Sequence, residues 1–168
     1  MIDGRTLAEL LEEAGIVTET EAGDDLRLTD RFADVWHRRI ERVRTGDRAR
    51  QQLALVLEVD PDELVTEETD GTFIVRLGGN TLGKWPSEAA SLADVALHPT
   101  LGEWLPVWDD LDGGSRDELL GRLRAFLETC PTCGGELQAV KKPEAGNERI
   151  EISLMCEECG AVTFRGAY

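Results

Sequence analysis

Apolar residues recur every three or four positions in several stretches of the chain, which is the spacing of amphipathic helices. The clearest stretch begins at Thr29 or Asp30, either of which can cap a helix, and it ends near Arg44. Its apolar face would consist of Phe32, Trp36, Ile40 and Val43. Similar spacing predicts four more helices, the last with Ser115 and Glu118 at capping-box spacing. These helices cover residues 6–15, 47–57, 87–97 and 115–128.

Other stretches alternate between apolar and polar residues or are rich in β-branched residues, and turn sequences separate them. Asp70-Gly71 and Gly78-Gly79-Asn80 are such turns, and they predict three strands between residues 64 and 85. Those strands cover 64–69, 72–77 and 81–85, and a later group covers 136–140, 149–154 and 161–164. Residues 99–108 are predicted to form short turns. Helices and hairpins in separate groups predict an α+β fold.

The chain is strongly acidic, with 34 Asp and Glu against 18 Lys and Arg and a formal net charge of −16. This balance argues against a globally basic nucleic-acid-binding protein and against attraction to an anionic membrane. The longest apolar runs are much shorter than the roughly 18 residues of a membrane span, and no signal-peptide pattern is present. We therefore expect a soluble protein in the cytoplasm, with no membrane partner.

Only three of the 18 cations are lysines, namely Lys84, Lys141 and Lys142. An acidic, lysine-poor composition resembles that of haloarchaeal cytosolic proteins, and the resemblance implies a cytoplasm of molar salt. At about 1 M salt the Debye length is only about 3 Å, so the net charge would repel a polyanion at contact range only. Local charge then decides what the protein can bind.

All four cysteines lie near the end of the chain as two C-x-x-C-G motifs, Cys130-Pro-Thr-Cys133-Gly and Cys156-Glu-Glu-Cys159-Gly. Two tight turns of this kind can direct four thiolates at one metal ion. Zinc is the expected metal, while iron in a rubredoxin-like site and a disulfide remain alternatives. Four thiolates complete the coordination of zinc, so we expect one structural Zn²⁺ rather than a catalytic one.

Residues 130–164 resemble a zinc ribbon, because the two cysteine motifs match that family's C-P-x-C-G and C-x-x-C-G forms and strand-like stretches surround them. The resemblance implies a small antiparallel sheet that holds the two motifs together. Zinc ribbons occur in transcription factors, RNA polymerase subunits and ribosomal proteins, and as stabilising appendages of enzymes. The family therefore implies a metal site more firmly than it implies an activity.

Residues 31–50 are the only positive segment, and Arg31, Arg38 and Arg42 fall on one face of the predicted helix there. Such a stripe of guanidinium groups could follow a phosphate backbone, or it could be a solvated, salt-bridged face. Lys141 and Lys142 could likewise meet DNA or RNA phosphates, or could simply keep a hairpin tip soluble.

Residues 6–44 resemble the second half of a winged helix. A helix is followed by a turn-rich stretch and then by Leu28-Thr29-Asp30, which opens an arginine-rich helix. The resemblance implies that the first helix reads bases, yet that helix carries Glu9, Glu12 and Glu13 and no basic residue after position 6. Together these patterns predict a helical, partly winged-helix-like region at 1–58, a central section at 59–129 with a hairpin and helices, and a zinc ribbon at 130–168. The first two can form one unit.

Two function classes follow from these residues. A non-catalytic zinc-ribbon protein in nucleic-acid or transcription-associated work is the leading hypothesis. The alternative is a protein–protein adaptor with purely structural zinc, whose partner surface would contain Trp85, Trp104 and Trp108. These indoles could instead fill a small core. No catalytic motif is visible in the sequence, so we expect no enzyme activity.

Overall fold

The computed structural model describes residues 4–23, 25–45, 47–143, 146 and 150–167. The described chain contains helices and three antiparallel sheets, which confirms the predicted α+β fold. Among the helices of these described ranges, none combines the length and apolar character that a bilayer span requires.

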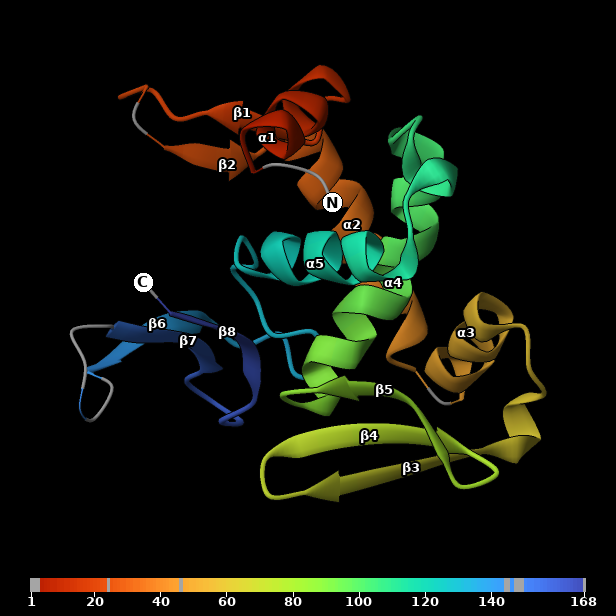
Figure 1. The fold of residues 1–168 in the computed structure, drawn as a ribbon. Coiled ribbons are helices and arrows are strands. Elements are labelled where there is room, and N and C mark those ends of the chain that lie inside the picture. Colours follow the sequence, from red (N-terminus) through yellow and green to blue (C-terminus); the bar gives the residue numbers. More distant parts are fainter. Residues whose placement is uncertain (1–3, 24, 46, 144–145, 147–149, 168) are drawn as a thin grey trace.

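Helix α4 (Glu88–Trp104) lies at the centre of the molecule and contacts three other helices (Figure 1). These are α2 (Asp30–Val43), α3 (Arg48–Leu57) and α5 (Gly113–Arg124). Most residues of the first ten positions of α4 are buried, including several alanines. Small side chains all round this helix let its neighbours approach it from several sides, and this explains why a weakly amphipathic segment forms the centre of the fold.

Helix α4 continues through Pro99, whereas the sequence pattern predicted its end near Leu97 and short turns after it. A proline inside a helix removes one backbone hydrogen bond and usually ends the helix. Here Leu97 and Leu101, on either side of the proline, are fully buried, and Thr100 Oγ1 donates to the carbonyl of Ala96 at 2.8 Å. The free energy gained by burying the turn after Pro99 outweighs the free energy lost with the backbone hydrogen bond. This burial depends on neighbouring helices, so the local sequence does not predict it.

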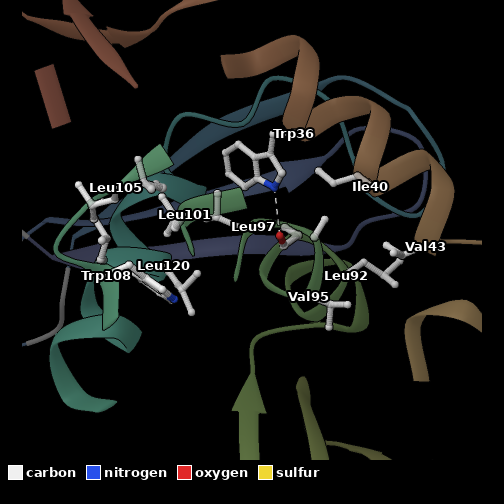
Figure 2. Packing of buried hydrophobic residues seen from close by; sticks show 14 of the residues in the cluster. Trp36, Ile40, Val43, Leu92, Val95, Leu97, Leu101, Leu105, Trp108 and Leu120 are labelled. Carbon is white, nitrogen blue, oxygen red and sulfur yellow. Dashed lines mark hydrogen bonds between the residues drawn. The ribbon is translucent and has the colours of Figure 1, made fainter. Parts of the chain in front are cut away.

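The main hydrophobic core lies between α2 and α4. Figure 2 shows the indole of Trp36 directed from α2 at α4, where its Nε1 donates a hydrogen bond of 3.0 Å to the carbonyl of Ala93. Trp36 is 1% exposed and Phe32 is fully buried. The predicted apolar face of this helix is confirmed, since its four members are all buried: Phe32, Trp36, Ile40 and Val43.

The N-terminal part has the predicted order of helix, turn-rich stretch and arginine-rich helix. Helix α1 (Gly4–Glu13) is followed by the two short antiparallel strands β1 (Val17–Glu19) and β2 (Leu26–Leu28), and then by α2. Thr29 is the N-cap of α2: its hydroxyl accepts from the backbone N–H of Phe32 at 3.3 Å and donates to the carbonyl of Gly15 at 2.6 Å. One threonine thus starts α2 and joins it to the end of α1.

Three strands follow α3 and a short 3-10 helix, η1 (Pro61–Glu63). They form one antiparallel sheet in the order β3, β4, β5. Their bounds are β3 Leu64–Thr69, β4 Thr72–Leu77 and β5 Asn80–Trp85. Thr69 pairs with Thr72 across the two-residue turn Asp70-Gly71, and both turn residues have positive φ, as the predicted hairpin requires.

The N-cap of helix α5 lies three residues before the predicted one, Ser115. Asp112 is its N-cap and accepts from the backbone N–H of Ser115 at 2.7 Å, so Ser115 lies inside the first turn. A second short 3-10 helix, η2 (Trp108–Asp110), connects α4 to this cap. The shift has a simple reason, since aspartate and serine are comparable N-caps and two flexible glycines stand between them.

The C-terminal sheet consists of three antiparallel strands in the order β6, β7, β8. Their bounds are β6 Leu137–Pro143, β7 Ile150–Cys156 and β8 Val162–Ala167. The predicted strands are all present, except that Arg149, the predicted first residue of β7, lies outside the described residues. Strand β8 contacts α4 and α5, and Ser87 Oγ donates to the carbonyl of Val162 at 2.5 Å. Both three-stranded sheets therefore meet near the N-terminal end of α4 (Figure 1).

Candidate metal centre

The two cysteine motifs fold into turns of the same design. In the first turn, the backbone N–H of Cys130 donates to Gly135 O at 2.8 Å, and the N–H of Gly134 donates to Cys130 O at 2.9 Å. In the second, Cys156 N–H donates to Ala161 O at 2.9 Å, and Gly160 N–H donates to Cys156 O at 3.0 Å. Gly134 and Gly160 have φ of 77° and 76°, which explains why glycine follows each pair of cysteines.

These turns bring the four sulfur atoms within 4.8 Å of one another. Cys133 Sγ lies 3.4 Å from Cys156 Sγ, and Cys130 Sγ lies 3.7 Å from Cys159 Sγ. A tetrahedral ion with bonds of about 2.3 Å would separate its sulfur ligands by about 3.8 Å. The chemistry and spacing of the donors therefore fit one tetrahedral metal ion, as the sequence predicted.

The cluster is partly buried and its sulfur atoms receive hydrogen bonds from the backbone. Cys130 and Cys156 are buried, while Cys133 and Cys159 are exposed. The N–H of Gly135 donates to Cys133 Sγ at 3.4 Å, and the N–H of Cys159 donates to Cys156 Sγ at 3.5 Å. Such donors stabilise thiolates, which are the form that binds metal.

The two exposed cysteines have pKa values shifted in opposite directions. The amide of Ala161 lowers the pKa of Cys159 to about 7. The amide of Gly135 also lowers the pKa of Cys133, but the neighbouring thiols, chiefly Cys156, outweigh it and raise that pKa to about 12. Cys159 therefore ionises at a lower pH than Cys133. A bound divalent cation would favour the ionised form of all four cysteines.

Two further residues of the site were not anticipated from the sequence. A Cβ atom at Gly135 would lie 2.9 Å from Cys156 Sγ, so only glycine fits beside the cluster. The hydroxyl of Thr132 lies 3.2 Å from Cys130 Sγ and 3.8 Å from Cys159 Sγ. The second glycine after Cys133 could have indicated the close contact at Gly135. No sequence pattern indicated the position of Thr132.

Arg31, Arg38 and Arg42 are exposed on the outer face of α2. Arg31 stacks over the ring of Trp104 at 5.5 Å, and Arg38 Nε donates to the backbone carbonyl of Asp34 at 3.4 Å. Within the described residues, neither Arg38 nor Arg42 has a carboxylate within ion-pair distance. The stripe is thus open to solvent and is not covered by the acidic middle section.

Lys141 and Lys142 are exposed neighbours on β6, and their side chains therefore lie on opposite faces of the sheet. Lys141 pairs in register with Ile152, and Lys142 pairs with Glu151. The two lysines cannot bind the same phosphate group, because their side chains point to opposite faces of the sheet. Each can contribute to a basic surface only by itself.

The three central tryptophans pack into the fold. Trp108 is 3% exposed and contacts the His98 ring edge-on at 5.0 Å, so the prediction that it belongs to a partner surface is wrong. Trp104 meets Phe32 edge-on at 5.1 Å, and Trp85 packs on Phe73 at 6.3 Å; both indoles are half-buried. The environment of the three indoles agrees with the alternative interpretation, in which they fill a core.

A buried ionic junction was also missed by the sequence patterns. Asp94 on α4 accepts a 2.7 Å hydrogen bond from Trp85 Nε1 and lies 3.2 Å from Arg124 Nε on α5. Burial raises the pKa of Asp94 to about 6, although Arg124 opposes the shift. Arg124 Nη1 also donates to the carbonyl of Thr163 on β8 at 3.4 Å. This junction joins the central section to the C-terminal sheet.

Comparison with protein-family models finds a match for the greater part of the chain. Residues 6–125 match the family model described as the central domain of a family of unknown function, DUF8054. No curated protein and no solved structure matches the chain. The matched region ends at Ala125, the C-cap of α5, and the four cysteines follow it. Because this match covers well over half of the 168 residues, the chain belongs to the DUF8054 family.

Proposed function

We propose that the protein is a non-catalytic zinc-ribbon protein that associates with nucleic acid through the outer face of α2. A four-cysteine site that fits one metal ion is the starting point. With four thiolates as ligands the ion has no open position for water or substrate, which favours a structural role. The two described histidines support the same conclusion, since His37 faces Glu41 and His98 packs on Trp108.

Zinc is the proposed ion. A tetrahedral four-thiolate site suits zinc and iron alike, so the surroundings must distinguish them. Rubredoxin-like sites, which hold iron, pack several aromatic residues around the metal. Here the described apolar residues that pack with the buried cysteines are aliphatic: Ala89, Leu127, Leu137 and Ala161. This aliphatic setting supports the proposed zinc ribbon.

The observation that carries the nucleic-acid proposal is the open pair Arg38 and Arg42, one helical turn apart on α2. Both are exposed and lack a described ion-pair partner, whereas the neighbouring Arg39 is engaged with Glu103 at 2.7 Å. Guanidinium groups that are free to donate suit phosphate oxygens. At high salt the net negative charge repels a polyanion at contact range only, while each arginine–phosphate contact still makes the affinity fall with salt.

Phosphate contact is assigned to α2 rather than to α1. If the winged-helix resemblance holds for residues 6–44, α1 occupies the position of the base-reading helix. Its exposed side chains include Glu9, Glu12 and Glu13, which would repel phosphates. We therefore expect backbone contact without sequence reading by α1. The adaptor alternative has less support, because Trp108 is buried.

The test is a salt titration of binding to duplex DNA, followed by fluorescence anisotropy from about 0.2 to 1 M KCl. The variant Arg38→Glu/Arg42→Glu should bind more weakly. The negative slope of log affinity against log salt should become shallower by roughly 2, because two phosphate contacts are lost. Arg48→Glu/Arg122→Glu is the charge-matched control, because it reverses two exposed arginines on α3 and α5, of which Arg122 also pairs with Glu118 at 2.7 Å. Absence of binding by the unmodified chain, or equal losses in both variants, would refute the proposal.

A further inference from the structure

A second cationic feature lies away from α2, where the two three-stranded sheets meet. It is a cleft of about 290 Å³ between the end of β5, the end of α5 and β8. Three cations from these three elements line it, namely Lys84, Arg124 and Arg165. Among the described residues that line the cleft none is acidic, in a chain with almost twice as many acids as bases.

A carboxylate neutralises only one of the three cations that line the cleft, among the described residues. Asp94 is buried and approaches Arg124 from α4, whereas Arg124 itself lines the cleft. Within the described residues, neither Lys84 nor Arg165 has a carboxylate within ion-pair distance. Both side chains belong to exposed residues. Two uncompensated cations beside a positioned guanidinium form an environment that attracts an anion.

Glycine occupies the positions at the tips of both guanidinium groups. A Cβ at Gly121 would lie 3.5 Å from Arg124 Nη2, and a Cβ at Gly71 would lie 3.8 Å from Arg165 Nη2. Gly71 is required by its turn, where φ is 73°. Gly121 lies inside α5, where glycine is less favourable than alanine and no turn explains it. A side chain at this position would contact Arg124 Nη2, and glycine leaves that contact open.

Apart from Thr72, the rest of the lining is uncharged and apolar, with Trp85 and Phe164 both half-buried at the cleft. The orientation of the Arg124 side chain is fixed by two contacts: its Nε lies 3.2 Å from Asp94, and its Nη1 donates to the carbonyl of Thr163. We propose that this cleft is a binding site for an organic phosphate: the three cations hold the phosphate group, and the aromatic side chains contact the carbon-containing part. The site is independent of the α2 surface.

The experiment uses the indole N–H of Trp85 as a local reporter, because Trp85 lines the cleft and its N–H donates to Asp94, the partner of Arg124. The full chain with its metal is labelled with ¹⁵N and titrated, in phosphate-free buffer at constant pH, with inorganic phosphate, adenosine monophosphate, adenosine and a single-stranded oligothymidine. We expect a saturable shift of the Trp85 signal with adenosine monophosphate and none with adenosine. Saturation by the oligothymidine alone would also support the site, and would identify nucleic acid as the source of the phosphate.

Two charge-removing variants give the decisive comparison. Lys84→Gln/Arg165→Gln should weaken binding at least about tenfold, since each substitution removes a charge-assisted hydrogen bond to the phosphate group. Lys141→Gln/Lys142→Gln removes the same charge from β6 and should leave the affinity unchanged. The proposal is overturned if no phosphate-bearing probe gives a saturable shift, if adenosine shifts the signal equally, or if the two variants behave alike. Losing DNA binding through Arg38 and Arg42 would leave this site untouched, so the two proposals fail separately.

Discussion

Asp94 illustrates how a single residue can carry a cost that its surroundings only partly offset. Its carboxylate is 7% exposed and has two partners, the Trp85 indole and the Arg124 guanidinium. Even so, loss of hydration dominates and raises its pKa from 3.8 to about 6. The folded chain therefore holds this proton more tightly than the unfolded chain does.

The sign of the resulting pH dependence follows directly. Between about pH 4 and 6 the folded state binds more protons at Asp94, so the free energy of unfolding should fall as the pH rises through this window. A shift of about two units corresponds to on the order of 3 kcal/mol. We expect the stability of the unmodified chain, measured relative to Asp94→Asn by denaturant titration, to decrease by up to this amount.

The Asp94→Asn reference matters, because protonation of the cysteines and release of metal also occur at low pH. Those effects are common to both chains and cancel in the difference. Parallel stability curves for the two chains across this pH range would show that Asp94 does not titrate in the way its burial implies.

At the scale of elements, helix α2 depends on its first residue as well as on its apolar face. The Thr29 hydroxyl satisfies the N–H of Phe32 and also holds the carbonyl of Gly15, which joins α2 to the N-terminal part of the chain. Asp30 could have been the cap on sequence grounds, but it lies inside the helix and is 96% exposed at its side chain. Thr29 therefore both caps α2 and joins it to the end of α1.

Thr29→Ala should lower the free energy of unfolding by about 1–2 kcal/mol, because it leaves a helix N–H without its acceptor and breaks the bond to Gly15. Asp30→Ala is the matched control and should cost about 0.5 kcal/mol or less, since it removes only an exposed ion pair with Arg27. Chemical denaturation of the two variants measures both. A larger loss from Asp30→Ala would contradict the assignment of Thr29 as the cap.

At the scale of the whole molecule, the described residues form two hydrophobic clusters of unequal size. The large one includes side chains from α1 to α5, whereas the small one consists of Ala89, Leu137 and the two buried cysteines with a few neighbours. A cluster this small cannot stabilise a three-stranded sheet by burial alone. The C-terminal sheet should therefore depend on its metal ion, while the helical core should not.

Removal of the metal tests this division of stability. With a chelator present, or in the variant Cys159→Ser, the amides of β6, β7 and β8 should exchange with solvent much faster, while those of α2 and α4 keep their protection. Hydrogen exchange read by mass spectrometry, with metal content measured in parallel, gives both quantities. Thr132→Ala, which removes a hydroxyl near two sulfur atoms but no ligand, is the control and should retain the metal.

Unchanged exchange in the C-terminal sheet after complete loss of metal would contradict this view. It would mean that docking of β8 onto α4 and α5, through Ser87 and the Arg124 contact with Thr163, is sufficient to hold the sheet.

Much of this architecture was readable from local patterns. The apolar face of α2, the hairpin at Asp70-Gly71 and the two cysteine motifs each depend on residues close together in sequence, so spacing alone predicts them. Metal ligation is the strongest example, since the chemistry of four thiolates leaves few alternatives. In each of these cases the physical cause acts within a few residues.

Tertiary structure decided the rest. Helix α4 passes Pro99 because the turn beyond it is buried, and Trp108 belongs to the core because α4 and α5 enclose it. The Asp94 junction and the cleft of Lys84, Arg124 and Arg165 both combine side chains from three or more elements. Such placements depend on how elements pack together, and the free energy of that packing is not written in any one segment.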